Sequence, residues 1–214
     1  YPPCVIKWMD FGLDSFATAC FHNAPALTAI SWMRYNEFDR PEPTKQFRGC
    51  FTVPRTFTIH ECPKTHLSTL YSIPLPSFEA QFSKVVDKIT PACLVEIELT
   101  NVTAKYIYIT LKNNHEHVDM EINRNNDGYF FFSRGIRSGL HDFGDHFCNT
   151  DKAPYFNKDH YKLKLFIDKH SIEIFDAEGE ISLTETVFPR SPYTDIVIDP
   201  IDGEAQHKIT IKTL

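Results

Sequence analysis

Residues 94–99 read Leu-Val-Glu-Ile-Glu-Leu, an alternation of apolar and acidic side chains. Successive side chains of a strand point to opposite faces, so Val95, Ile97 and Leu99 share one face and the two glutamates the other. Residues suited to tight turns occupy positions 125–128 and 176–179. The alternation recurs at 106–111, 118–122, 163–167, 172–175, 181–187, 196–198 and 209–211. We therefore expect two antiparallel sheets packed as a β-sandwich.

The first 75 residues have a different texture, because their apolar runs are aromatic and less regular. Four strands are predicted there, at 16–21, 27–33, 50–53 and 67–72. Four strands are too few for a stable open domain but equal one blade of a β-propeller. A proline-rich stretch at 73–76 then follows, as a linker would. We expect an all-β chain with a blade in residues 1–76 and a sandwich in 77–214, in which only 78–86 has a helical pattern.

Composition narrows the class of protein. With 214 residues, 42% hydrophobic and 14% aromatic, the chain can bury a substantial core. Its 22 basic and 28 acidic residues give a net charge of −6, without the basic run of a nucleic-acid binder. No apolar run reaches the roughly 18–20 residues of a membrane helix, so we expect no membrane partner. The chain opens with Tyr1-Pro2-Pro3 and no signal-like segment, and we expect a processed product or a fragment.

The cysteines and histidines do not form a recognisable metal motif. None of the six cysteines falls in a C-x-x-C pair, so we expect mostly buried thiols without a disulfide, although disulfides stay open. His115-Glu116-His117 lacks a third ligand nearby and is interpreted as a solvated loop. We therefore predict no metal and no cofactor. The cysteines are Cys4, Cys20, Cys50, Cys62, Cys93 and Cys148.

Several segments, in order along the chain, carry a resemblance to a known family. Residues 10–17 read Asp-Phe-Gly-Leu-Asp-Ser-Phe-Ala, 31–33 read Ser-Trp-Met, and 43–55 read Pro-Thr-Lys-Gln-Phe-Arg-Gly-Cys-Phe-Thr-Val-Pro-Arg. This order resembles the last blade of glycoside hydrolase family 32, the invertases, inulinases and fructanases: D-[FY]-G-x-D-F-Y-A, then W-M, then P-T-x-x-W-R-G-x-M-T-x-P-R. Phe132-Ser133-Arg134-Gly135 is similar to the F-D-R-S segment of that family. Residues 167–175 with Gly179-Glu180 are similar to its sandwich signature.

The resemblance implies a five-bladed propeller followed by a sandwich, of which this chain holds the last blade and the sandwich. It also implies a retaining glycosidase that uses a carboxylate nucleophile and a glutamate acid placed close together. The family takes these groups from its W-M-N-D-P-N-G, R-D-P and E-C-P motifs, which precede the blade present here. We therefore expect no catalytic residue in this chain, and no activity without the missing N-terminal blades. Sucrose or a fructan would bind the complete enzyme, a homodimer could form through the sandwich, and secretion is expected with a cytoplasmic location left open.

Two segments imitate the catalytic motifs. Glu61-Cys62-Pro63 spells the acid motif but follows the Asp-Phe-Gly strand instead of preceding it. Residues 125–128 read Asn-Asn-Asp-Gly and lie between two alternating strands, where a hairpin turn explains them. We interpret both matches as coincidence.

The resemblance also suggests which residues line the substrate subsite. Trp32 matches a tryptophan that stacks on the sugar, and Asp14 and Phe16 stand in the D-F-Y-A segment, where Phe16 lacks the tyrosine hydroxyl. Tyr35 or Asn36 stands where many members carry a second aromatic pair. Arg48 is expected to stabilise the blade. Two sandwich residues, Asp168 and Glu173, are expected to be structural, with Glu173 facing outward or pairing with a lysine.

One alternative of another class stays open. The sandwich could be a non-catalytic module that grips carbohydrate on an exposed aromatic face, or a structural remnant that binds nothing. The aromatic run at 129–132 could supply such a face, although consecutive residues point to both sides and suit a buried strand better. The polar loop at 141–146 is a candidate contact with the missing propeller.

Overall fold

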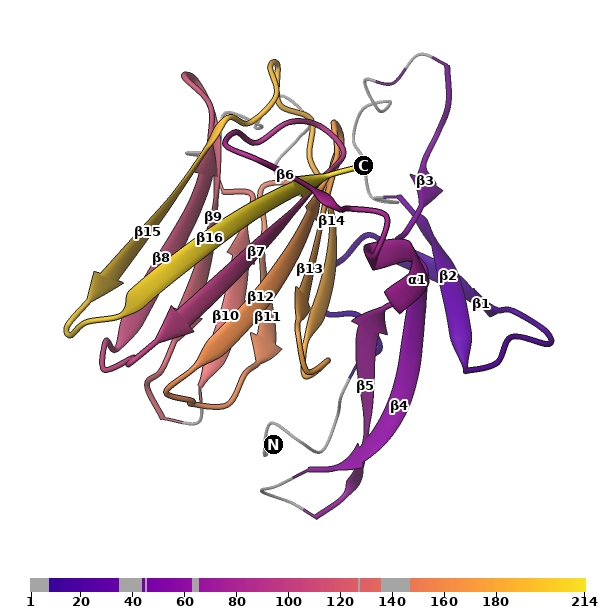
Figure 1. Cartoon of the computed structure of the whole chain (residues 1–214), viewed down its shortest axis with the longest axis horizontal. Helices are drawn as coiled ribbons and strands as arrows, with labels where there is room; N and C mark the ends of the chain where they lie inside the picture. The colour runs from indigo at the N-terminus through magenta and orange to yellow at the C-terminus, as the bar shows by residue number, and fades with distance from the viewer. Residues whose placement is uncertain (1–7, 35–43, 45, 63–65, 127, 136–146) are drawn as a thin grey trace.

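Strands dominate the chain, as the alternation predicted (Figure 1). The computed structural model describes residues 8–34, 44, 46–62, 66–126, 128–135 and 147–214. Among these residues the strands form one blade-like sheet and the two sheets of a sandwich, and the blade stands beside the sandwich (Figure 1). The all-β expectation is confirmed.

The blade has the strand order β1-β2-β4-β5, and β3 pairs with β2 beside this path. One predicted assignment is wrong. Residues 50–53 do not form the third strand of the blade, because β3 is a two-residue pair. The third place belongs to β4, which pairs with β5 over its whole length. The strands are β1 (Ser15–Cys20), β2 (Thr28–Met33), β3 (Cys50–Phe51), β4 (Arg55–Glu61) and β5 (Ser68–Pro74).

The sandwich consists of a six-stranded sheet, β14-β13-β12-β7-β16-β6, and a five-stranded sheet, β11-β10-β9-β8-β15, within the described residues. Its pairings are antiparallel, as predicted. The first sheet holds β6 (Lys84–Val86), β7 (Cys93–Thr100), β12 (Tyr161–Ile167), β13 (Ser171–Asp176), β14 (Ser182–Thr186) and β16 (Gln206–Thr213). The second holds β8 (Tyr106–Lys112), β9 (His117–Asn123), β10 (Tyr129–Ser133), β11 (Thr150–Pro154) and β15 (Asp195–Ile201).

The core lies between these two sheets and follows the predicted period of two. Val95, Ile97 and Leu99 of β7 are buried against Ile109 and other inward residues of the second sheet. Strand β10 alternates as well, with its two even-numbered phenylalanines buried. The aromatic run is therefore a strand with one buried face, as its sequence favoured.

The predicted turns are present. Gly128 has φ +87° between β9 and β10, and Gly179 has φ +88° between β13 and β14, a backbone region that glycine enters at no steric cost. The Asn-Asn-Asp-Gly run is thus part of a hairpin, and its Asp127 lies outside the described residues.

The helical prediction for 78–86 is largely wrong. The helix α1 (Pro76–Glu79) is a single turn, and residues 84–86 form β6 at the sheet edge. The spacing of Phe78 and Phe82 has another cause, because both rings pack against Phe166, with centroids 6.0 and 5.4 Å away. The helical spacing of these two phenylalanines therefore reflects their packing on the sheet and not a longer helix.

Strands β13 and β14 depart from the period of two, because every one of their residues is buried. The blade covers their outer face, with β13 against β5 and β14 against β2. A second apolar cluster fills part of this junction, formed by Val53, Phe82, Leu94, Phe166 and Phe175. The blade and the sandwich thus share a buried interface.

The described cysteine thiols differ in their exposure to solvent. Cys62 and Cys93 are buried, whereas Cys20 and Cys50 are exposed, so the expectation of buried thiols is right for the first pair and wrong for the second. Cys4 lies outside the described residues. No helix in the described ranges is long and apolar enough to cross a membrane.

Candidate functional site

The predicted subsite tryptophan lies in the middle of an aromatic row on the blade. Trp32 of β2 stands opposite Phe16 of β1 on one side and Phe51 of β3 on the other. The Phe16 and Trp32 rings meet edge to face with centroids 6.2 Å apart, and the Arg34 guanidinium lies 5.4 Å from the indole centre. Phe16 is 51% exposed and Phe51 is 71% exposed. The row is therefore an open apolar surface that can stack on the apolar face of a ligand.

Gly49 explains how the indole is held. The residue has φ +68°, and a Cβ there would lie 2.3 Å from Trp32 Nε1 and 2.9 Å from the Met33 carbonyl oxygen. Only glycine permits both this backbone conformation and this close approach. The Arg-Gly-Cys segment thus positions Trp32 from behind. The charged residue of that segment, Arg48, donates to the Thr44 carbonyl oxygen in the same loop, in keeping with a stabilising role.

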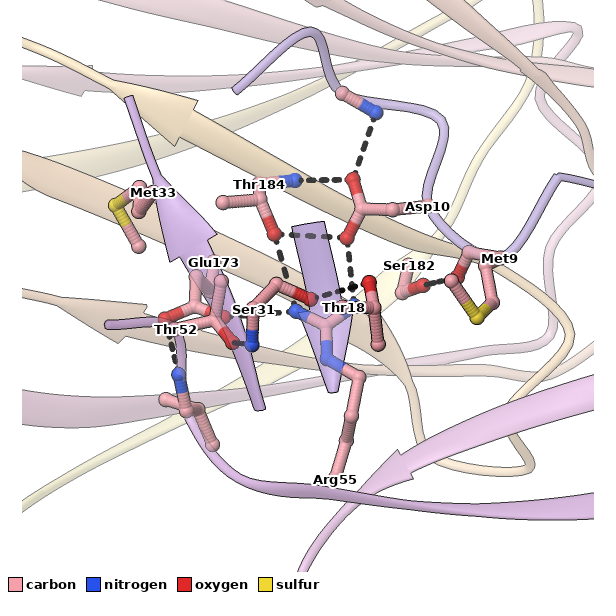
Figure 2. A network of polar contacts seen from close by, with 12 residues as sticks. Met9, Asp10, Thr18, Ser31, Met33, Thr52, Arg55, Glu173, Ser182 and Thr184 are labelled. Atoms are coloured by element: carbon pink, nitrogen blue, oxygen red, sulfur yellow. Dashed lines mark hydrogen bonds and ion pairs between the residues drawn. The ribbon is translucent and has the colours of Figure 1, made fainter. Parts of the chain in front are cut away.

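Asp10 begins a buried polar network that joins the blade to the sandwich (Figure 2). Its Oδ1 accepts hydrogen bonds from the amides of Gly12 and Thr184, both at 2.9 Å. Its Oδ2 accepts from the Thr184 hydroxyl at 2.7 Å and from Arg55 Nη1 at 2.6 Å. A Cβ on Gly12 would lie 2.3 Å from the Thr184 carbonyl oxygen, so glycine is required where this segment runs along β14. The Asp-Phe-Gly motif therefore holds the blade onto the sandwich edge.

Arg55 extends the network across the junction (Figure 2). Its Nη2 donates to Glu173 Oε2 at 2.9 Å, and Glu173 Oε1 accepts the Val53 amide at 2.7 Å. Arg55 and Glu173 are both buried. The expectation that Glu173 faces outward to solvent or a lysine is wrong, because the blade covers that face of β13. Asp168, its companion in the sandwich signature, is exposed in the turn between β12 and β13.

Arg134 makes a second buried link, two residues further along β14. Its Nη1 donates to Asp14 Oδ2 at 2.6 Å, while Asn149 Oδ1 accepts from its Nη2 at 2.9 Å. Asp14 Oδ2 also accepts from the amide and the hydroxyl of Thr186, at 2.5 and 2.7 Å. Asp14 is completely buried. Its proposed contact with substrate stays a prediction, but these contacts give its carboxylate a place between the blade and the sandwich.

Burial shifts the pKa values of several acidic side chains at this junction. Burial raises the pKa of Glu173 to about 7, although Arg55 and the Val53 amide act in the opposite direction. Burial also raises the pKa of Glu185 well above its usual value, and that of Asp151. Glu185 lies 3.5 Å from Arg134. Each of these shifts favours the protonated acid, so the contribution of these three side chains to stability is greatest at low pH.

The remaining predicted residues lie apart from this region. Glu61 ends β4 on the surface, where its Oε1 lies 2.6 Å from His66 Nδ1. His115 is exposed, and Glu116 between the two histidines is buried and accepts the Arg190 amide at 2.7 Å. The described ranges contain no group of three or more His, Cys, Asp or Glu side chains suited to a metal ion. Tyr35, Asn36 and the loop at 141–146 lie outside them.

Comparison with known proteins connects the two halves of the chain. Residues 2–74 match the Glycosyl hydrolases family 32 N-terminal domain, and residues 73–213 match the Glycosyl hydrolases family 32 C terminal domain. The chain belongs to glycoside hydrolase family 32. The resemblance inferred from its motifs is thereby confirmed.

Other members of family 32 resemble the chain along nearly its whole length. The levanbiose-producing levanase of Bacillus subtilis is 24% identical over 232 residues, which cover 96% of this chain and 44% of the levanase. The extracellular exo-inulinase of Aspergillus niger is 24% identical over 208 residues, 86% of this chain and 38% of the inulinase. The crystal structure of exo-inulinase from Aspergillus awamori has a TM-score of 0.80 at 21% identity, covering 97% of this chain and 44% of that one. The chain thus spans less than half the length of these relatives.

The sequence did not identify the junction residues as such. Asp10, Arg55 and Arg134 lie in motifs that the sequence singled out, yet each has a partner on the other unit, 118–174 positions away. One signal was available, because an acidic residue on the outer face of β13 sits among apolar neighbours and therefore needs a buried partner.

Proposed function

We propose that this chain is the C-terminal part of a family 32 enzyme that hydrolyses β-fructosidic bonds in sucrose or fructans with retention of configuration. The blade and the sandwich alone would be inactive. One observation carries the proposal. The chain, of this family, spans less than half of its relatives and contains the two sheets of a sandwich but a single blade with exposed apolar side chains.

The uncovered face supports a missing neighbour. Large apolar side chains on the blade are between 50 and 72% exposed, whereas a soluble unit normally buries such a concentration. Blades of a propeller cover one another in this way, so upstream blades are the partner that this face fits. Two of them, Phe16 and Phe51, flank Trp32 on one face of the blade. The others, elsewhere on the blade, are Phe21, Leu27, Ile59 and Leu67.

The blade would then contribute a wall of the substrate subsite. Phe16 and Trp32 present ring surface that can stack on a fructosyl unit, and Gly49 fixes the indole in place. Asp14 is better suited to positioning this wall, since its carboxylate is bound by Arg134 and Thr186. The nucleophile and the acid would come from the upstream motifs of the family, where two carboxyl groups close together give a covalent intermediate and retention.

The substrate class follows from the names of the relatives. They include a levanase and an exo-inulinase, and a β-fructofuranosidase from Schwanniomyces occidentalis was solved with fructosyl-erythritol. That structure has a TM-score of 0.71 at 17% identity, covering 96% of this chain and 48% of that one. Secretion is proposed because the Aspergillus niger relative is named extracellular. A homodimer through the sandwich stays a prediction.

The experiment measures the mass of the native protein recovered from its source, and fructose release from sucrose and inulin by that protein and by the 214-residue chain. We expect a native species much heavier than 24.8 kDa that releases fructose, and no fructose release by the 214-residue chain. A native species of this size that releases fructose would overturn the proposal. Glu61 and Asp127 would then become candidate catalytic groups.

A further inference from the structure

The outer face of the second sandwich sheet carries aromatic rings on both sides of a polar strand. On β10, Phe131 stands opposite Glu121 of β9, and Glu121 stands opposite Tyr108 of β8. Two residues further along each strand, Tyr129, Asn123 and Tyr106 form a second row across the same three strands. We call these six residues the aromatic face.

A hollow of about 450 Å³ lies on this face. Its lining includes Tyr108, Phe131, Glu121, Asn123 and, one position further, Asp119. Tyr108 is 37% exposed, and Phe131 and Glu121 are half-buried, so ring surface and carboxylate oxygens are accessible together. The volume is in the range of sites that hold small organic ligands.

The side chains of the aromatic face are held before any ligand arrives. The ammonium of Lys152 lies 3.6 Å from the centre of the Tyr129 ring, and Tyr129 lies 6.2 Å from Phe131. Asn123 Nδ2 donates to Glu121 Oε1 at 2.9 Å. A ligand therefore loses little affinity to the ordering of these groups.

The outer face of the other sheet shows that this arrangement is not a general property of the sandwich. There, cross-strand ion pairs replace the rings, with Lys162 3.2 Å from Glu98 and Lys212 2.8 Å from Glu96. Such pairs satisfy each other and protect a sheet surface from association. The aromatic face instead combines rings with carboxylates. Asp119 accepts the Thr110 hydroxyl at 2.8 Å and lies 3.5 Å from His117, and a carboxylate with these partners still has lone pairs for a further donor.

We propose that the aromatic face binds a neutral oligosaccharide chain, with sugar rings on Phe131 and Tyr108 and sugar hydroxyls donating to Glu121 and Asp119. Ring faces that alternate with carboxylates match a ligand whose apolar C–H faces alternate with hydroxyl donors. The carboxylates of Glu121 and Asp119 repel an anionic ligand such as a phosphate, and the single ammonium of Lys152 on this face offsets their charge only in part. They also interrupt the apolar surface that a second copy of the chain would need. The choice of a fructan as the first probe rests on the proposed function.

The test uses the 214-residue chain and an inulin-type oligosaccharide, with a cello-oligosaccharide of equal length as the second probe. Binding is followed by titration calorimetry and by amide chemical shifts, and free fructose is assayed in the same samples. Phe131→Leu keeps the strand apolar but removes the ring, and Glu121→Gln removes the charge. The matched control is Glu98→Gln on the outer face of the other sheet.

We expect the inulin oligosaccharide to shift amides of β8, β9 and β10, and Phe131→Leu to weaken binding about tenfold or more, as a contact at the centre of a site does. Glu98→Gln should bind as the parent chain does. No binding of either probe, equal binding by Phe131→Leu, or concentration-dependent self-association through the same amides would overturn the proposal. Free fructose in these samples would contradict the proposed inactivity of the chain and leave the binding result to be judged by itself.

Discussion

The sandwich and the blade differ in how much of their apolar surface they bury. The sandwich closes two sheets over a core in which Val95, Ile97 and Ile109 are inaccessible. The blade is one sheet, and its Phe51 and Ile59 are more than 70% exposed. Burial of apolar surface is the main favourable contribution to folding, so the sandwich can be stable alone whereas the blade depends on its neighbours. In the described structure the only such neighbour is the sandwich itself.

The junction between them combines an apolar cluster with buried charge. Two arginines, Arg55 and Arg134, each neutralise acids from both units. Removal of one partner of a buried pair leaves the other charge without compensation, which costs more than the pair contributes when intact. The blade should therefore respond strongly to changes at the junction and weakly to changes on its open face.

The largest effect is expected for Arg134→Ala. It leaves the Asp14 carboxylate buried without its cation, and such a loss costs about 3–5 kcal/mol of the free energy of unfolding. Urea denaturation measures it. The control is Lys105→Ala, whose partner Asp202 lies 3.5 Å away on the surface, where a pair contributes about 1 kcal/mol or less. Equal effects of the two substitutions would contradict a stabilising junction.

The same isoleucine-to-alanine substitution should destabilise the sandwich much more than the blade. Ile109→Ala opens a cavity in the sandwich core and should lower the free energy of unfolding by about 2–5 kcal/mol. Ile59→Ala removes a side chain that is 72% exposed and should change it by less than about 0.5 kcal/mol. Thermal and urea unfolding of both variants check this. A large loss in Ile59→Ala would mean that this part of the blade is covered within the chain.

Gly12→Ala tests the attachment of the blade to β14. A Cβ would lie 2.3 and 2.5 Å from backbone atoms of Thr184, so the segment must move away and strain Asp10 and its hydrogen bonds. We expect a loss of about 1–3 kcal/mol, as for overpacking of a filled core. Gly135→Ala is the control, because its nearest contact is the Ser133 hydroxyl at 3.1 Å. Comparable losses would remove the special role of Gly12.

The pH dependence of stability tests the acids of the junction. The folded-state pKa of Glu173 is about 7, above its ordinary 4.5, so folding favours the protonated form. Its stabilising contribution is complete below pH 4.5 and is lost as the pH rises through 7. Glu173→Gln should flatten the decline of the free energy of unfolding between pH 5 and 8. Glu98→Gln, an exposed acid whose pKa is lowered by Lys162, should leave this decline in place.

The sequence predicted most of the fold because the sandwich strands are buried on one face only. Strand β13 does not meet this condition, because both of its faces are buried. The period of two assigned Glu173 correctly to the outer face of β13. It could not show that the blade covers this face, so Glu173 was wrongly expected to be exposed. The strand Arg55–Glu61 was missed because its ends belong to conspicuous motifs, Pro-Arg and Glu-Cys-Pro.

The candidate site was predictable in part. The aromatic surface at Phe16 and Trp32 follows from the motif resemblance, and the structure places the two rings together. The environment of Asp14 does not follow, because its partner Arg134 is 120 positions away and only the docking of the two units brings them together. Long-range pairs of this kind carry no signal in one sequence.

Amide hydrogen exchange of the 214-residue chain tests the central claim, that the sandwich is stable by itself whereas the blade lacks neighbouring blades. We expect the amides of β7, β9 and β12 to exchange only by global unfolding, and those of β1 and β4 to exchange much faster through local opening. Protection of β1 and β4 equal to that of β7 would contradict the claim, because the blade would then be stable without further neighbours.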